Sequence, residues 1–275
     1  MTALMIGRVI DSGKLSFDTA LADALPDIKM RDDYRKVTIA QLLTFTGGIQ
    51  PYTQIGPKLT PILFELTGSA AEQQEQFVRH VLQEEPVVKP GTERKYSNAS
   101  YVVAVLAASG KTGRGWEVLM EEEVFKPLRL TKAGFGRPRG KGRPNEPWLH
   151  RKGEKGYEPE PKEPQAEPAA VLAGAGGVHC SIRDFARFAS YELSAARGKD
   201  ALRKPATAKR WQELSKGEAS EGRPVFGGTE WLTAGYVLWP SKDVAAAVAV
   251  NGGSAADACE AVFKAVEDRY VGSDK

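Results

Sequence analysis

The order of apolar and polar positions predicts a mainly helical first half. Residues 1–10 are apolar on nearly every side, which is typical of a helix buried deep in a protein. A short helix that ends in a turn is predicted over 38–49. Thr38 is its N-cap, apolar residues follow at helical spacing, and a pair of glycines ends it. Helical spacing also predicts longer helices over 70–82 and 116–125.

One turn in this half places polar groups beside an apolar helix. The Pro-Gly loop over 89–91 has turn chemistry, and an apolar run broken only by small residues follows over 99–108. Gly110 is expected to end that helix as its C-cap. Tyr96 and Asn98 are therefore expected at a loop-to-helix junction, where a phenol and a carboxamide can both point into a cleft.

The second half changes from helical to strand-like patterning. Ser181 is a candidate helix N-cap, and Asp184 follows three residues later near the positive end of that helix. Two β-rich runs, over 232–238 and 244–250, are separated by a hairpin-type turn. Helical spacing returns over 255–270. Helices first, then an antiparallel hairpin and a closing helix, indicate an α+β fold.

The middle of the chain, 134–168, is poor in aliphatic residues and dense in proline, glycine and charge. Such a segment cannot bury enough surface to hold regular structure by itself, so we expect a long surface loop anchored by Trp148. His150 is a candidate catalytic base, although a lone histidine in a basic loop is more often solvated or stacked. His179 has no carboxylate partner close in sequence, and we expect it to be structural.

Composition narrows the class of protein. The 275 residues are 41% hydrophobic, which is enough for a sizeable core. The net charge of +3, from 38 basic and 35 acidic residues that are mostly interleaved, argues against nucleic-acid binding. Cys180 and Cys259 are expected to be buried free thiols. The sequence has no run of about 18 apolar residues, so no transmembrane segment is predicted. The first residues lack the basic-then-apolar order of a signal peptide. No metal or cofactor is expected.

The beginning of the chain admits two interpretations. A buried helix needs its first N–H groups satisfied by a cap, yet the sequence opens directly on the helical pattern. Either Thr2 caps a slightly frayed first turn, or the chain begins inside a helix whose first turn is missing, through gene truncation or a misassigned start.

Five segments follow one another in the order of a single family. They are MTALMIGRVIDSGKLSFDTALADALPDI, VTIAQLLTFTGGI, PGTERKYSNASYVVAVL, PWLHR with AGGVHCSIRDFARFA, and the terminal hairpin and helix. Together they resemble the β-lactamase and penicillin-binding-protein superfamily of serine hydrolases, in particular its class C β-lactamase, esterase and D-alanyl carboxypeptidase branch. The resemblance covers nearly the whole chain. It implies a β-lactamase/transpeptidase-like fold, an antiparallel sheet flanked by helices plus a mainly helical region.

The resemblance also implies a domain organisation. It predicts one domain over 1–275, with the N-terminal strands and the start of the nucleophile helix missing. Within that domain we expect a mainly helical region over 14–175, including the surface loop over 134–168. An α/β portion with the terminal hairpin and helix is expected over 176–275.

The chemistry of such a family needs three groups. An activated serine attacks an acyl carbon, a lysine three residues later removes its proton, and a tyrosine shares general-base and general-acid duty. Tyr96 matches that tyrosine, so the resemblance implies that it is catalytic. Asn98 matches the asparagine that binds the substrate amide and the lysine.

The sequence departs from the family pattern at the other two motifs. The family's Ser-x-x-Lys would lie just before residue 1, and no Ser-x-x-Lys of the right context replaces it. The third motif, a Lys or His followed by Thr, Ser or Gly and then Gly on a strand edge, aligns best at Phe226, where an apolar ring replaces the cation. The resemblance implies substrate binding by Gly227, Gly228 and Thr229.

Two further positions bear on the comparison. Residues 111–113 spell Lys-Thr-Gly, but they follow a helix C-cap in a short loop, so we interpret the match as coincidence. Phe45 stands where the family has a histidine, which lowers the polarity near the cleft.

Three functions remain open on the sequence. The first is a serine hydrolase that acts on an amide, an ester or a β-lactam, inactive as given because the nucleophile and lysine are absent. The second is a non-catalytic binding protein of the same fold, which Phe226 favours. The third, an unrelated hydrolase that uses His150 or His179, has no nucleophile-elbow motif in support. A small-molecule or peptide acyl ligand is implied, the family suggests a periplasmic or secreted location, and the oligomeric state stays open.

Overall fold

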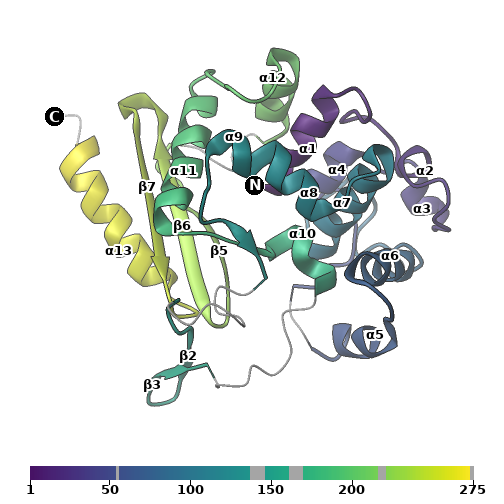
Figure 1. Ribbon diagram of the computed structural model, residues 1–275, viewed down its shortest axis with the longest axis horizontal. Helices are drawn as coiled ribbons and strands as arrows, with labels where there is room; N and C mark the ends of the chain where they lie inside the picture. Colours follow the sequence, from purple (N-terminus) through teal and green to yellow (C-terminus); the bar gives the residue numbers. More distant parts are fainter. Residues whose placement is uncertain (54–55, 137–145, 161–169, 216–220, 273–275) are drawn as a thin grey trace. The chain divides into compact units, whose positions relative to one another are not determined.

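The computed structural model describes residues 1–53, 56–136, 146–160, 170–215 and 221–272. They divide between two compact units (Figure 1): unit 1 is Met1–Pro127 with Pro168–Val178, and unit 2 is Leu128–Glu167 with His179–Lys275. Unit 1 is helical and unit 2 contains an antiparallel sheet with helices. The fold is α+β, as the residue pattern predicts.

Unit 1 consists of helices joined by turns. These are α1 (Thr2–Asp11), α2 (Leu21–Ala24), α3 (Asp32–Arg35), α4 (Ile39–Leu43), α5 (Leu59–Glu65), α6 (Ala70–Val81), α7 (Asn98–Thr112), α8 (Trp116–Met120), the π-helical η1 (Glu121–Phe125), the 3-10 turn η2 (Ala170–Leu172) and α10 (Ala173–Gly176). The short α9 (Lys126–Leu128) spans the boundary between the two units. The helices predicted over 1–10, 38–49, 70–82 and 116–125 are all present.

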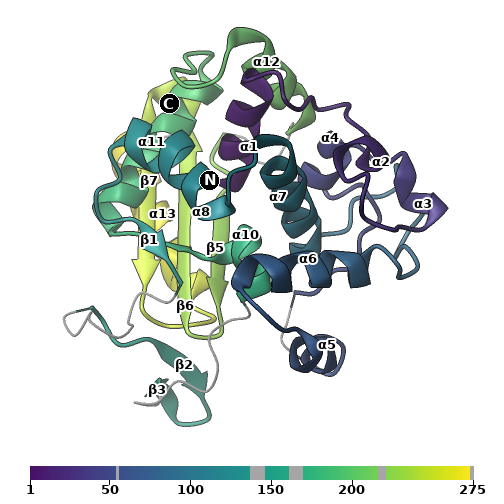
Figure 2. The ribbon, with the colours of Figure 1, turned by 45° about the vertical axis from the view of Figure 1, so that its right-hand side comes forward.

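Helix α7 forms the centre of unit 1. Figure 2 shows it with α1, α4, α6 and α10 around it, and each of these helices packs against it. The buried positions of α7 are filled by small and β-branched side chains, namely Ala99, Ser100, Val102, Val103, Ala104, Val105, Ala107 and Ala108. Small side chains let neighbouring backbones approach closely, so α7 can be surrounded on several sides at once. The residues that begin α7 are consequently held by a rigid, buried element.

The C-terminus of α7 corrects the expected cap. The helix continues through Gly110 to Thr112, and Gly113 is the cap, in the left-handed conformation with φ 70°. A residue there needs positive φ, which costs glycine little, whereas Gly110 has ordinary helical geometry. The apolar run alone placed the end of the helix one turn too early.

The beginning of α1 excludes one interpretation of Thr2. Its hydroxyl donates a hydrogen bond of 2.8 Å to the backbone carbonyl of Gly174, and no side chain caps the helix at Met1. Thr2 therefore ties α1 to α10 and does not act as an N-cap. The burial of the helix is as predicted, since Leu4, Met5, Ile6 and Val9 are almost completely buried.

Unit 2 is organised around a three-stranded antiparallel sheet in the order β5-β6-β7. Its elements are β1 (Gly134–Phe135), β2 (His150–Gly153), β3 (Gly156–Pro159), α11 (Ile182–Ala196), α12 (Pro205–Leu214), β5 (Val225–Thr229), β6 (Leu232–Trp239), the 3-10 turn η3 (Pro240–Lys242), β7 (Val244–Val250), α13 (Ala256–Val266) and the π-helical η4 (Glu267–Val271). The two-residue β4 (Val178–His179) spans the boundary between units. The predicted hairpin is β6–β7, and the predicted closing helix is α13 with η4.

Helices α11 and α13 cover opposite faces of this sheet (Figures 1 and 2). The alternation of side chains along β6 explains the arrangement. Tyr236 makes edge contacts with Phe188 and Phe185 of α11, at centroid distances of 6.0 Å. The next residue, Val237, points to the other face and joins a buried cluster with Cys259 and Phe263 of α13. Side chains on both faces of β6 are thereby covered by a helix, whereas most of the edge strand β5 stays exposed.

The segment expected to be a surface loop contains a β-hairpin. Strands β2 and β3 pair antiparallel, so that Gly153 lies opposite Gly156 across a two-residue turn. Backbone hydrogen bonds hold the base of the hairpin to the sheet region, from His150 N–H to the Trp231 carbonyl and from Gly253 N–H to the His150 carbonyl. The expectation of no regular structure was wrong here, because these backbone bonds do not require aliphatic burial. Residues 137–145 and 161–168 of the expected loop lie outside the described residues.

Leu149 is the buried apolar residue among the described residues of this segment, at 5% exposure, whereas Trp148 is only partly buried. The expected anchor is therefore shifted by one position. Both cysteines are free, as predicted; Cys259 is buried and Cys180 is partly buried.

Candidate active site

The Tyr-x-Asn motif lies at the start of α7, and its middle residue caps the helix. The Oγ of Ser97 accepts a hydrogen bond of 3.0 Å from the N–H of Ser100. The same hydroxyl donates to the backbone carbonyl of Gln50 at 2.7 Å. A buried capping serine thus fixes the backbone from which the neighbouring side chains, Tyr96 and Asn98, project.

Tyr96 and Asn98 contact each other directly. The Tyr96 hydroxyl donates a hydrogen bond of 3.0 Å to Oδ1 of Asn98. On its other side, Nδ2 of Asn98 donates to the backbone carbonyl of Tyr52, also at 3.0 Å. The Asn98 backbone N–H donates to the Pro51 carbonyl at 2.8 Å. These bonds orient the carboxamide with its oxygen toward the phenol, and they leave a second amide N–H for another acceptor.

An aromatic residue supports the ring of Tyr96. The rings of Phe45 and Tyr96 lie 4.8 Å apart at a tilt of 50°, and the guanidinium of Arg94 lies over Phe45 at 5.1 Å. Phe45 has a left-handed backbone, φ 60°, and its carbonyl accepts a hydrogen bond from the Lys95 N–H. The position that carries a histidine in the resembled family therefore contributes packing here.

The surroundings of Tyr96 favour its protonated form. Although 54% of the residue is exposed, partial burial raises the pKa of the phenol, and the positive charge of Arg94 opposes that rise. The hydroxyl is therefore protonated at neutral pH and donates to Asn98. In this state Tyr96 is chemically a proton donor.

The third predicted motif lies on β5, which is an edge strand of the sheet in unit 2. Phe226 is 36% exposed, and its ring packs at 5.9 Å from that of Phe263. A side chain at Gly227 would meet open space, whereas one at Gly228 would overlap the backbone carbonyl of Leu232. The pairing of β5 with β6 thus explains Gly228 by itself, while Gly227 leaves room beside the strand.

Of the five residues predicted for the site, Tyr96 and Asn98 come together in unit 1. The other three follow one another along β5 in unit 2. Thr229 ends that strand, and its Oγ1 accepts a hydrogen bond of 3.1 Å from the Trp231 N–H. This bond gives Thr229 a structural role in the β5–β6 turn.

The second Lys-Thr-Gly match lies at the end of α7. Lys111 and Thr112 belong to the helix and Gly113 is its cap, so the match does not lie in the loop expected after a cap at Gly110. The Thr112 hydroxyl donates to the Ala108 carbonyl at 2.8 Å. These residues are explained by helix termination.

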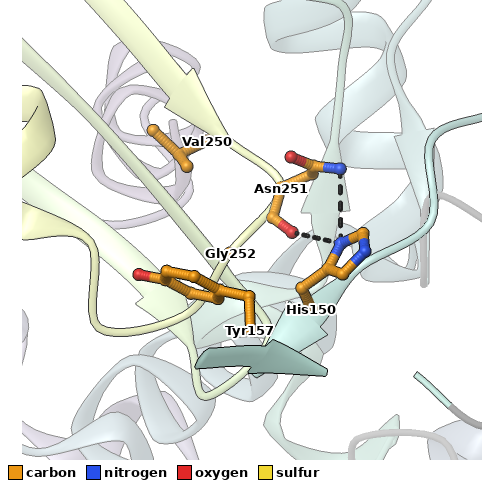
Figure 3. Close-up of a pocket in the computed structure, with 5 residues that line it drawn as sticks. All are labelled: His150, Tyr157, Val250, Asn251 and Gly252. Atoms are coloured by element: carbon orange, nitrogen blue, oxygen red, sulfur yellow. Dashed lines mark hydrogen bonds between the residues drawn. The ribbon is translucent and has the colours of Figure 1, made fainter. Parts of the chain in front are cut away.

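His150 lines a cavity of about 270 Å³ in unit 2, together with Tyr157, Val250, Asn251 and Gly252. Figure 3 shows its ring turned toward Asn251, whose backbone carbonyl lies 3.1 Å from Nδ1. Nδ1 also lies 3.4 Å from Nδ2 of Asn251, and the tautomer of the imidazole decides which of the two contacts is a hydrogen bond. In either tautomer His150 is held by Asn251. Among the described residues that line the cavity there is no serine, cysteine or lysine.

His179 packs against a glycine-rich stretch of unit 2. Its Nδ1 lies 3.0 Å from the Gly136 carbonyl, and a Cβ at Gly134 would come within 2.8 Å of its Nε2. The imidazole therefore occupies the space that a side chain at Gly134 would fill, which is consistent with the structural role expected of it.

Sequence reasoning missed Tyr52 and Gln50, whose backbone carbonyls bind Asn98 and Ser97. A backbone acceptor leaves no mark on residue type, so no motif points to it. The one available signal was the polar stretch with Pro51 directly after the glycine turn, which indicates an ordered loop.

The described part of the chain has neither a metal-binding cluster nor a membrane-spanning helix. No group of three or more histidine, cysteine, aspartate or glutamate side chains there is arranged to hold a metal ion. Among the described residues, no helix combines the length and apolar character needed to cross a bilayer.

Comparison with known proteins gives a consistent result. Residues 1–262 match the family model described as Beta-lactamase. A β-lactamase of Escherichia coli (strain K12) is 25% identical over 192 residues, which are 70% of this chain and 45% of that protein. The chain thus spans less than half the length of this curated relative.

Solved structures agree with this match. A penicillin-binding protein homologue from Pyrococcus abyssi, described as octameric, has a TM-score of 0.73 at 18% identity and covers 97% of this chain and 63% of its own. A D-stereospecific amidohydrolase from Streptomyces sp. has a TM-score of 0.70 at 19% identity, with 94% and 84% covered. The likeness shows a β-lactamase/transpeptidase-like fold.

Proposed function

This chain belongs to the Beta-lactamase family, and we propose that it carries the proton-transfer and substrate-binding half of a serine-hydrolase site for acyl compounds. The observation that supports the proposal is the bond from the Tyr96 hydroxyl to Oδ1 of Asn98, at the start of the buried helix α7. A phenol and a carboxamide locked together on a rigid element are preorganised, so little ordering is needed when a ligand binds.

Each residue has a proposed task in acyl transfer. In a site that also held the serine and the lysine, the Tyr96 hydroxyl, whose pKa is raised by partial burial, would donate a proton to the leaving group and regain one from the attacking serine. The second N–H of Asn98 Nδ2 donates to the amide oxygen of the substrate. On β5, the open side of Gly227 lets a ligand approach the strand backbone. Thr229 and Gly228 keep the strand in register.

The ligand class follows from the names of the relatives. They are a β-lactamase, a penicillin-binding protein homologue and a D-stereospecific amidohydrolase. These names support a small molecule or peptide with an amide, ester or β-lactam group as the ligand. The near balance of charge, 38 basic to 35 acidic residues, gives no support to a nucleic-acid ligand.

The 275 residues contain no Ser-x-x-Lys, so we propose that the chain as given binds acyl compounds without forming an acyl-enzyme. Without nucleophile and lysine, the covalent step has no attacking group. Loss of a catalytic nucleophile typically lowers the rate by several orders of magnitude.

A fluorescent penicillin tests both the proposed binding and the proposed absence of an acyl-enzyme. Added to the folded chain, it should show a reversible increase in fluorescence anisotropy. After the mixture is denatured, we expect no covalently labelled protein. Asn98→Ala is expected to weaken that binding about three- to tenfold, the size of one lost hydrogen bond. Tyr270→Phe, which changes an exposed tyrosine outside the site, is the control. A covalent label on any serine would contradict the inactive state, and absence of reversible binding would contradict the site itself.

A non-catalytic binding protein of the same fold is the second candidate. Phe226 favours it, because an apolar ring stands where the resembled motif has a cation, and this ring packs on Phe263. Intact-mass and N-terminal analysis of the protein isolated from its natural source distinguishes the two. A Ser-x-x-Lys directly before residue 1 supports the hydrolase, and a natural protein that starts at residue 1 supports the binding protein.

A further inference from the structure

The carbonyl that holds Asn98 belongs to a residue with an unfavourable backbone. Tyr52 has φ 47°, in the left-handed region that bulky residues rarely adopt. Its carbonyl nevertheless accepts the 3.0 Å bond from Asn98 Nδ2. Such a conformation persists only where surrounding contacts hold it, and such positions cluster at functional sites.

The side chain of Tyr52 provides a strong contact of this kind. The residue is 5% exposed, and its hydroxyl donates a hydrogen bond of 2.6 Å to Oε2 of Glu84. Its ring meets the edge of Phe77 at a centroid distance of 5.2 Å. A short bond to a carboxylate is among the strongest neutral-to-charged hydrogen bonds in proteins. The phenol is therefore fixed at both its ring and its hydroxyl.

A lysine completes the arrangement. Lys58 Nζ lies 3.1 Å from Oε1 of Glu84 and over the Tyr52 ring at 5.2 Å, and it donates to Oε1 of Gln50 at 2.8 Å. Gln50 is also the residue whose carbonyl accepts from Ser97. The side chains thus hold the same loop whose carbonyls hold the motif at the start of α7.

We propose that Tyr52 is a positioning residue for Asn98. Its phenol, held by Glu84, keeps the strained backbone in place, so that the carbonyl fixes Nδ2 of Asn98 and leaves Oδ1 facing Tyr96. That this positioning matters for ligand binding rests on the proposed function, in which Asn98 contacts the substrate. The geometry of the carboxamide itself is independent of any ligand.

The side-chain amide of Asn98 can be observed directly. Asparagine occurs only at positions 98, 145 and 251, so protein labelled with [15N]asparagine gives few side-chain amide signals, and Asn98→Ala assigns the one of interest. Tyr52→Phe removes only the hydroxyl that bonds to Glu84. We expect the Asn98 amide protons to shift and to exchange with solvent about tenfold faster, the effect of losing a hydrogen bond to a charged group.

Tyr34→Phe is the matched control. Tyr34 is fully buried, and its hydroxyl has no hydrogen-bond partner among the described residues. It lies near the same carboxylate as Tyr52, because the pKa of its phenol is raised first by burial and second by the charge of Glu84. The same chemical change there should leave the Asn98 amide as in the wild type. An equal effect of both variants, or no effect of Tyr52→Phe, overturns the proposal.

Glu84→Gln keeps the test decisive if Tyr52→Phe does not fold. The glutamine retains a neutral acceptor for the Tyr52 hydroxyl, so we expect an exchange rate between those of the wild type and a broken bond. An unchanged rate in a folded Glu84→Gln overturns the proposal. Penicillin affinity is measured on the same samples. If the wild type does not bind, the proposed function fails, while the amide signals still report whether Tyr52 positions Asn98.

Discussion

The hydroxyl of Tyr96 donates a hydrogen bond of 3.0 Å to Oδ1 of Asn98, two residues along the chain. Tyr96 lies directly before the buried N-cap Ser97 of helix α7, and Asn98 is the first residue of that helix. A phenol that donates to a neutral amide is stabilised in its protonated form. This relationship makes the ionisation of Tyr96 a measurable property of the site.

Tyr96 is expected to ionise above the ordinary range of tyrosine. Burial raises the pKa of its phenol and the charge of Arg94 lowers it, so Arg94→Met should raise it further. A group with a raised folded-state pKa contributes stability that is lost as pH rises through that value, so the effect appears only at alkaline pH. NMR titration of [13Cζ]tyrosine-labelled protein measures the pKa, with Tyr96→Phe for assignment. A lower pKa in Arg94→Met would contradict the prediction.

The two glycines near the end of α7 should respond oppositely to alanine. Gly113→Ala forces a Cβ into the left-handed region at φ 70° and should destabilise the fold by about 1 kcal/mol. Gly110→Ala replaces an exposed glycine inside the helix, where a Cβ meets nothing within 4 Å, and should stabilise by about 0.5–1 kcal/mol. Urea unfolding of both variants measures the difference. Equal effects would mean that the helix ends elsewhere.

Alanine substitution should destabilise the fold at Gly228 of the β5 motif but not at Gly227. At Gly228 a Cβ overlaps the Leu232 carbonyl, so Gly228→Ala should cost about 1–3 kcal/mol. At Gly227 a Cβ meets open space, so Gly227→Ala should change stability by less than about 0.5 kcal/mol. If Gly227 borders a ligand as proposed, its alanine variant weakens penicillin binding while leaving thermal unfolding unchanged. Loss of folding in Gly227→Ala would contradict the assignment.

The thiol of Cys180 should react slowly in the folded protein. Burial, helped by the nearby charge of Asp184, raises its pKa to about 11. Compared with an ordinary value near 9, this lowers the thiolate fraction at pH 8 about a hundredfold. Reaction with a disulfide reagent should therefore accelerate about tenfold per pH unit up to pH 10. Mass spectrometry identifies the modified cysteine, and the denatured chain is the reference. Fast labelling of Cys180 at pH 7 would exclude the raised pKa.

Local signals in the sequence predicted much of the fold correctly. Thr38 caps α4 in a capping box with Gln41, and Ser181 caps α11 by accepting from the Asp184 N–H. Such caps depend on residues three positions apart, so they are visible in sequence. The family resemblance is confirmed by the match over residues 1–262. It could be recognised in the sequence because several motifs in the correct order carry more information than any single motif.

Two of the corrected predictions depended on contacts between residues far apart in the sequence. The hairpin over 150–159 is held by backbone bonds to Trp231 and Gly253, far along the chain. Thr2 does not cap its own helix because its hydroxyl finds the Gly174 carbonyl. In both cases the deciding partner is a backbone group, which has no residue-type signature.

The candidate site shows the same division. The sequence by itself determined that a phenol and a carboxamide, Tyr96 and Asn98, lie two residues apart at a loop-to-helix junction, because the motif and the cap between them are local. Only the tertiary structure decided which way the carboxamide faces. That orientation is set by the carbonyl of Tyr52, a residue held 46 positions earlier in the chain by its bond to Glu84. The rotamer of a polar side chain depends on the hydrogen-bond donors and acceptors around it, and only folding brings those groups together.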